Sequence, residues 1–188
     1  MNPPSFTLDK MACMKVFTKF RRLTAMVSVA FFCCASSSFA ATSDVIGEKS
    51  FGDWRSVLYQ DQNDGQLYCS LEPNETNQIV RVRYYKRDDD AYLEIFNPGW
   101  NPTEDRVTFG LRIQRNEGDA TTYQFDGKTW GDAYAHDLLD TNAFELVMTL
   151  FGGAAKMAVR SRNGQNVVHF SMSGIRDAIS DFKDCMKK

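Results

Sequence analysis

The two histidines are the side chains best suited to proton transfer near neutral pH, and each has polar neighbours. His169 and Ser171 alternate with apolar residues, so on a strand they share one face, as a general base beside a hydroxyl would. His136 precedes Asp137, and Asp140 follows three residues later, which suits a histidine–carboxylate dyad. The His169 pattern is also typical of the polar face of a half-buried strand, and we favour that interpretation. We therefore assign no catalytic residue.

The residue spacing indicates neither a metal site nor a phosphate-binding site. Zinc sites use three or four ligands at recognisable spacings, which two isolated histidines do not supply. The run Asp88-Asp89-Asp90 lacks the alternating carboxylates and the glycine of a calcium loop, and it suits the solvated tip of a hairpin. The sequence also contains no Gly-x-Ser-x-Gly and no phosphate-binding glycine loop. We expect no metal and no cofactor.

The first forty residues have the pattern of a secretory signal. A basic stretch up to Arg22 precedes the short apolar segment 23–35, and Ser38-Phe39-Ala40 fits the small-x-small cleavage pattern. A membrane span needs roughly 20 mostly apolar residues, more than this segment offers. We expect cleavage near Ala40, giving a signal peptide 1–40 and a single domain 41–188. The domain is then periplasmic or secreted, with no stable membrane insertion after cleavage.

Cleavage would leave two of the five cysteines, Cys69 and Cys185. In an oxidising compartment they can pair, closing a loop between positions 116 apart. On the chain-entropy model such a loop contributes roughly 4–5 kcal/mol of stability. The alternative is two buried free thiols. A catalytic dithiol is disfavoured because the domain has no Cys-x-x-Cys spacing.

The charge of the predicted mature domain is acidic. Residues 1–40 contain five of the 22 Lys and Arg and one of the 24 Asp and Glu, so the remainder has a net charge near −6. A nucleic-acid-binding domain would be expected to have a basic face, and anionic lipid surfaces also attract basic segments. We therefore expect neither partner.

Short alternating segments separated by turn residues predict a strand-rich domain. In segment 79–85 we expect Val80 and Val82 to be buried and Arg81 and Arg83 to be solvated on the opposite face. We expect hairpin turns at Asp88–Asp90, Asp126-Gly127 and Asn163-Gly164. The expected strands cover residues 50–59, 66–71, 79–85, 91–96, 106–113, 122–125, 129–130, 154–160 and 167–172.

Two segments have helical periodicity. In segment 140–151 apolar residues recur every three or four positions, and Gly152-Gly153 would end the helix. Ser173 can cap a final helix with an apolar stripe that ends near Cys185. The predicted fold class is α+β, mostly antiparallel β and sandwich-like, with a short internal helix and a C-terminal amphipathic helix packed on the sheet.

The aromatic residues crowd the strand-rich half, where we expect most to be core and cross-strand pairs. Trp100 differs because it lies in the turn-rich segment Asn97-Pro98-Gly99-Trp100-Asn101-Pro102. A tryptophan there is either a lid over the core or an exposed partner contact. Trp100, Asn97 and Asn101 are therefore the candidate contact residues.

Both ends of the predicted domain carry short motifs: Phe51-Gly52-Asp53-Trp54 followed by Cys69, and the segment 170–178 that runs from a strand into the last helix. With these motifs the chain resembles secreted proteobacterial proteins related to the invasion-associated locus B family. The resemblance implies an envelope-located β-rich domain without known catalysis, sometimes tied to host interaction. This chain lacks the cysteine that often follows the early tryptophan and the internal cysteine pair, so no disulfide pattern is carried over.

These observations predict a non-enzymatic binding or interaction domain of the bacterial envelope. Its partner would be another protein or an envelope component, contacted through sheet edges and the loop 97–102. One alternative is an envelope hydrolase with a Ser or carboxylate site near His136 or His169. Another is a small-ligand carrier with a cavity among the aromatic residues.

Overall fold

The computed structural model describes residues 43–75, 79–96, 105–115, 118–130, 133–138, 140–160 and 166–188. The predicted signal peptide and the contact residues Asn97, Trp100 and Asn101 lie outside these ranges. Within them are ten strands and two helices: β1 (Ser43–Phe51), β2 (Trp54–Asp61), β3 (Leu67–Pro73), β4 (Ile79–Tyr85), β5 (Asp90–Phe96), β6 (Arg106–Gln114), β7 (Ala120–Trp130), β8 (Ala133–Asp137), α1 (Thr141–Gly152), β9 (Lys156–Arg160), β10 (Asn166–Ser171) and α2 (Ile175–Lys187).

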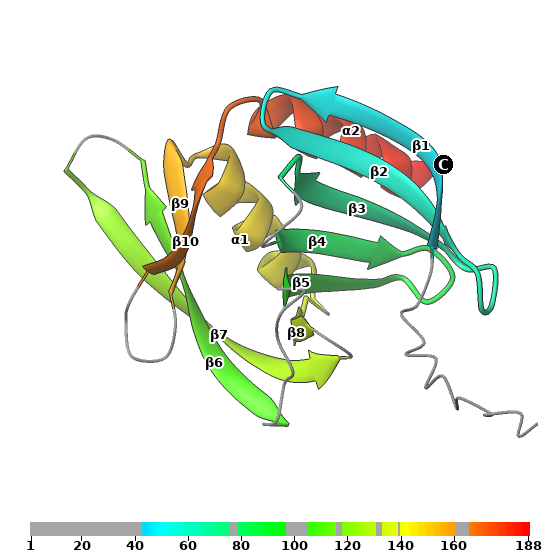
Figure 1. Cartoon of the computed structure of the whole chain (residues 1–188), viewed down its shortest axis with the longest axis horizontal. Coiled ribbons are helices and arrows are strands. Elements are labelled where there is room, and N and C mark those ends of the chain that lie inside the picture. Colours follow the sequence, from blue (N-terminus) through cyan, green and yellow to red (C-terminus); the bar gives the residue numbers. More distant parts are fainter. Residues whose placement is uncertain are drawn as a thin grey trace, which may run out of the picture. The chain divides into compact units, whose positions relative to one another are not determined.

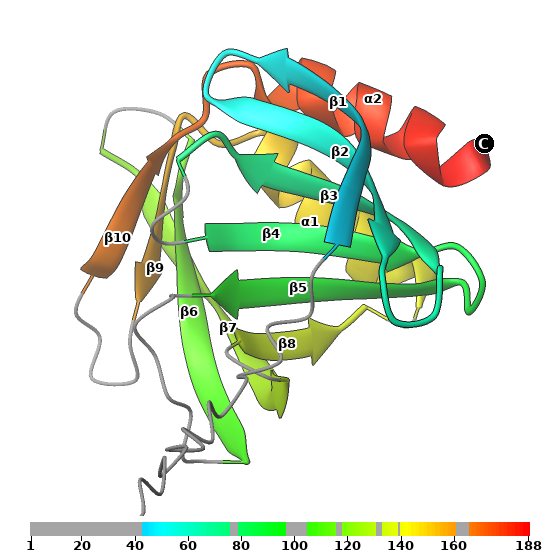
Figure 2. The same ribbon diagram turned by 45° about the vertical axis from the view of Figure 1, so that its right-hand side comes forward.

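The strands form one antiparallel sheet in the order β1-β2-β3-β4-β5-β8-β7-β6-β9-β10. The sheet curls like half a barrel, and α1 lies within the curl (Figure 1). Helix α2 packs on β1, β2 and β3, and Figure 2 shows both helices on the same face of the β1–β5 part of the sheet. The predicted α+β class, with an internal helix and a C-terminal helix packed on the sheet, is confirmed.

The two helices bury the apolar stripes that their sequences predict. Helix α1 begins after Asp140, whose carboxylate accepts a hydrogen bond of 2.7 Å from the Ala143 N–H. Helix α2 buries Ile175, Ala178 and Phe182 against the sheet. These stripes and the inner faces of the strands together form the hydrophobic core.

The predicted cap of α2 by Ser173 is wrong. The residue that precedes the helix is Gly174, with a left-handed φ of 80° and no side-chain cap. A Cβ atom at this position would lie 1.9 Å from the carbonyl oxygen of Phe51. The backbone of the β1–β2 turn therefore approaches too closely for any residue but glycine.

Two predicted strand boundaries also differ from the structure. The expected single strand 50–59 is divided between β1 and β2 by a turn at Gly52, whose φ is 61°. The expected turn at Asp126-Gly127 is absent because β7 runs through it without a break. A Cβ on Gly127 would lie 3.0 Å from the Phe109 ring and 3.2 Å from Cβ of Tyr134, so this glycine serves close packing.

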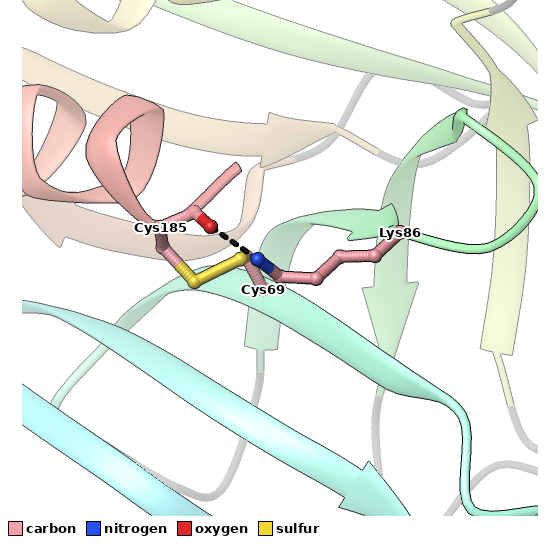
Figure 3. The surroundings of a disulfide bond; sticks show 3 residues. All are labelled: Cys69, Lys86 and Cys185. Carbon is pink, nitrogen blue, oxygen red and sulfur yellow. Dashed lines mark hydrogen bonds between the residues drawn. A yellow bond between two sulfur atoms is a disulfide. The ribbon is translucent and has the colours of Figure 1, made fainter. Parts of the chain in front are cut away.

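The predicted disulfide between Cys69 on β3 and Cys185 in the last turn of α2 is present. Lys86, just after β4, donates a hydrogen bond of 2.5 Å from Nζ to the carbonyl oxygen of Cys185 (Figure 3). One turn earlier in the helix, Lys49 of β1 forms an ion pair with Asp181. The end of α2 is thus tied to three strands, and the Lys86 ammonium lies where the helix dipole favours a cation.

Candidate functional site

Alternation of side chains gives β2–β5 two faces of different chemistry. The inner face, toward the helices, presents apolar side chains such as Leu71, Val82 and Leu93, all buried. We call the opposite side the outer face; it continues onto β8 and the end of β7. The outer face carries tyrosine, arginine and glutamate side chains that pair across the strands.

Five aromatic rings from five strands contact one another on the outer face. We call these residues the outer aromatic row: Tyr59, Tyr68, Tyr85, Tyr92 and Trp130. Ring centroids lie 5.1 Å apart for Tyr59–Tyr68 and for Tyr68–Tyr85. Trp130 stacks on Tyr85 at 5.8 Å and meets Tyr92 edge-on at 4.8 Å. Such contacts favour fixed ring orientations.

Trp130 is the exposed end of the outer aromatic row. Its relative exposure is 46%, whereas Tyr68 is buried. Among the described residues none accepts a hydrogen bond from its indole N–H. Contacts with Tyr85 and Tyr92 hold the ring, so docking a partner on it would cost little further side-chain entropy.

A first ion pair lies beside the row, on β2 and β3. Glu72, only 2% exposed, accepts hydrogen bonds from Arg55 Nη2 at 2.7 Å, Tyr59 Oη at 3.0 Å and Ser70 Oγ at 2.7 Å. Burial and the Glu72 carboxylate raise the pKa of Tyr59, so its phenol stays protonated and donates. The carboxylate is thus fully partnered, as a buried charge must be.

A second cluster occupies β4 and β5. Glu94, also 2% exposed, lies 2.5 Å from Arg81 Nε and 3.4 Å from Arg83 Nε. The Arg83 guanidinium lies 5.0 Å from the centre of the Tyr68 ring. Burial opposes the charge of Arg83, but the Glu94 carboxylate together with Tyr85 and Tyr68 outweighs this effect, and the pKa of Arg83 is raised. The guanidinium therefore stays charged.

The expectation that Arg81 and Arg83 are simply solvated is wrong. Their side chains are 14% and 19% exposed because they pack against Glu94 and the neighbouring rings. The predicted burial of Val80 and Val82 on the opposite face is confirmed. Both faces of β4 are therefore largely withdrawn from water, one by apolar packing and one by ion pairs.

His136 does not form the histidine–carboxylate dyad that its neighbours in the sequence suggest. His136 Nδ1 lies 2.9 Å from the Asp126 carbonyl oxygen, and its ring packs edge-on against Phe125. Asp137 points to the other face of β8 and pairs with Lys128, while the Asp140 carboxylate caps α1. The structure thus uses both candidate carboxylates elsewhere.

His169 is exposed beside Ser171 on one face of β10, opposite buried Phe170, as the alternation predicts. Across the described ranges, no serine hydroxyl forms a hydrogen bond with either histidine. The Asp88–Asp90 hairpin tip also matches its prediction: Asp89 accepts a hydrogen bond from Tyr84, and Asp88 interacts with Arg87 and Gln66.

Both edges of the sheet carry irregularities that discourage strand addition. In β1 the pairing with β2 skips a residue between Val45 and Gly47, and in β10 the pairing with β9 shifts between Asn166 and Val168. Bulges bend an edge strand and interrupt its row of hydrogen-bonding groups. The sheet edges, predicted as contact surfaces, therefore present interrupted rows of hydrogen-bonding groups.

The described part of the chain contains no cluster of three or more His, Cys, Asp or Glu side chains that could hold a metal ion. In that same part, neither helix has the length and apolar character needed to cross a membrane. Comparison with known proteins adds no information about function. No family model matches the chain, no curated protein matches it, and no solved structure matches it.

The outer aromatic row was missed by reasoning from the sequence. Trp130 lies in the strand-rich half, whose aromatic residues are mostly expected in core and cross-strand pairs, and the turn expected at Asp126-Gly127 falls inside β7. A usable signal was the alternation within segment 79–85. Tyr85 follows Arg81 and Arg83 at intervals of two residues, which places an aromatic ring on the charged face.

Proposed function

We propose that this chain is a non-catalytic, exported binding domain that docks a protein partner on its outer face, with Trp130 as the anchor. The observation that carries the proposal is an exposed indole held in place by Tyr85 and Tyr92. Anchors of this kind, surrounded by packed side chains that exclude water, dominate the binding energy of protein interfaces.

The composition of the outer face supports a protein partner. Tyrosine, tryptophan and arginine are the residue types enriched in interface hot spots, and all three meet here. The cations Arg55, Arg81 and Arg83 are balanced locally by Glu72 and Glu94. A face without a strong net charge, in an acidic domain, suits a protein surface better than a polyanion.

The ion pairs also support a role beyond folding. Replacing a buried ion pair with well-packed apolar residues is often neutral or stabilising. Apolar residues like those of the inner face could therefore occupy the outer face without a loss of stability. The presence of charged and phenolic groups on the outer face is explained if a partner forms hydrogen bonds or ion pairs with them.

Export is part of the proposal. The disulfide supports an oxidising compartment, and the signal-like residues 1–40 and the resemblance to the invasion-associated locus B family point to the periplasm or the cell exterior. The partner would then be another envelope or extracellular protein.

Site-specific photo-crosslinking tests the proposal. A benzophenone amino acid at position 130 is compared with the same group at position 146 on α1, where Leu146 is 50% exposed on a different surface. We expect a saturable adduct with one protein from position 130 and none from position 146. Equal or absent labelling from the two positions would contradict the proposal.

A further inference from the structure

A hollow of about 250 Å³ lies between β1, β2 and α2, and it leads to the disulfide. Its wall includes Leu58 and Cys185, and Gly47 lies along β1. Charged side chains also line it: Glu48, Lys49, Asp181 and Lys188. The outer aromatic row lies on the opposite face of the sheet, so this site is separate from the proposed docking surface.

The hollow gives access to one sulfur of the disulfide. Cys185 lines it and is half-buried, whereas Cys69 is 0% exposed and does not line it. A nucleophile that attacks a disulfide must approach one sulfur from the side away from the other. Of the two cysteines only Cys185 lines the hollow, so an incoming thiolate would meet Cys185 first.

One lysine ammonium contacts the helix end that carries Cys185. The Lys86 ammonium is held against the Cys185 carbonyl beside the two sulfur atoms (Figure 3). Lys49 and Lys188 line the hollow, and Lys49 is paired with Asp181. The charged side chains that line the hollow balance one another, so the Lys86 ammonium is the cation that can stabilise the thiolate that leaves.

We infer that Cys185 is a site of thiol–disulfide exchange with low-molecular-weight thiols. The thiolate of the incoming molecule forms a new S–S bond to Cys185 Sγ, and the Cys69–Cys185 bond breaks. Its electron pair leaves on Cys69 as a thiolate beside Lys86, and this thiolate then takes a proton from water. The incoming sulfur is oxidised, Cys69 is reduced, and Cys185 carries the mixed disulfide.

The test is the reaction of the oxidised protein with glutathione, trapped with iodoacetamide and mapped by peptide mass spectrometry. We expect glutathione on the Cys185 peptide and the alkyl group on the Cys69 peptide, in roughly tenfold excess over the reverse pattern because access selects the attacked sulfur. Equal amounts of the two patterns, or the reverse, would overturn the inference.

Gly47→Leu tests the role of the hollow. No atom lies within 4 Å of a Cβ at Gly47, so the substitution fits the fold and fills the hollow instead. We expect exchange to slow by about fivefold, through lost access. The control is Val45→Leu on the same strand, an exposed position that does not line the hollow. A Gly47→Leu protein with an unchanged melting temperature and an unchanged exchange rate would contradict the inference.

Discussion

The inner and outer faces of β3–β5 are buried by different means. On the inner face, Leu71 and Leu93 are buried against helices and need no partner beyond close packing. On the outer face, Glu72 and Glu94 are almost as inaccessible, yet each carries a charge that only specific donors can compensate. The contrast teaches that one sheet buries its two faces differently: the inner face by apolar packing against helices, the outer face by pairing charged and phenolic groups across strands.

The two described tryptophans on opposite faces of the sheet allow the strongest test of this contrast. Trp54 is fully buried on the inner side, packs on Phe151 and Phe170, and donates a 2.8 Å hydrogen bond to the Ser171 carbonyl. Trp54→Ala should cost about 3–5 kcal/mol of unfolding free energy, as large-to-small core changes do.

Trp130→Ala should cost much less, about 1 kcal/mol or below, because the ring is half exposed. Urea unfolding of both variants measures the two losses. Similar losses for the two tryptophans would mean that the outer face contributes to stability as much as the core does. That result would contradict the proposed difference between the two faces.

Removing the carboxylate of Glu94 should also destabilise the domain strongly. Glu94→Ala leaves Arg81 and Arg83 packed on the face without their counter-charge, which costs about 3 kcal/mol. The triple variant with leucine at positions 81, 83 and 94 should regain most of that stability, because packed apolar residues can replace a buried ion cluster. Guanidinium chloride unfolding decides between the outcomes: a triple variant as unstable as Glu94→Ala would show that the fold itself depends on these charges.

The smallest effect concerns the protonation of Tyr92 on the outer face. Burial, helped by the nearby Asp90 carboxylate that accepts its hydroxyl, raises the pKa of Tyr92 to about 12 from an ordinary value near 10. Because the folded pKa is the higher one, the folded state binds this proton more tightly. The resulting stability is fully present below pH 10 and is lost as the pH rises from about 10 to 12.

Absorbance at 295 nm against pH should therefore show one fewer late-ionising tyrosine in Tyr92→Phe than in the wild type, in which the pKa values of Tyr59 and Tyr84 are raised as well. The unfolding free energy of that variant should also fall less steeply above pH 10 than that of the wild type. If the unfolding free energy falls equally steeply with pH in the two proteins, Tyr92 does not contribute to the pH dependence of stability.

Local patterns predicted much of the fold. The stripe of α2 and the Val80–Val82 alternation identified buried faces because burial follows the period of each element. Predictions at glycines were weaker. Gly127 is expected in a turn but lies inside a strand, where neighbouring side chains approach it closely. Gly174 is not expected as a cap, yet the close approach of the Phe51 carbonyl requires a glycine there.

The outer aromatic row could not be assembled from the sequence. Its members come from five strands, and β8 separates β5 from β7 in the sheet, so the contacts between Tyr92 and Trp130 depend on strand order. The alternation in segment 79–85 placed two arginines together but carried no information about Glu94, the buried glutamate that meets both of them from β5. Pairing across strands, and not residue type, turned a face expected to be solvated into a buried one.

The most direct test of the central claim is a competition experiment on the adduct formed from position 130. Unlabelled wild-type protein and Leu146→Ala should suppress crosslinking at the same concentration. Trp130→Ala should need roughly thirtyfold more, the affinity lost with a hot-spot residue worth about 2 kcal/mol. If Trp130→Ala competes as well as the wild type, the outer face is not the docking surface.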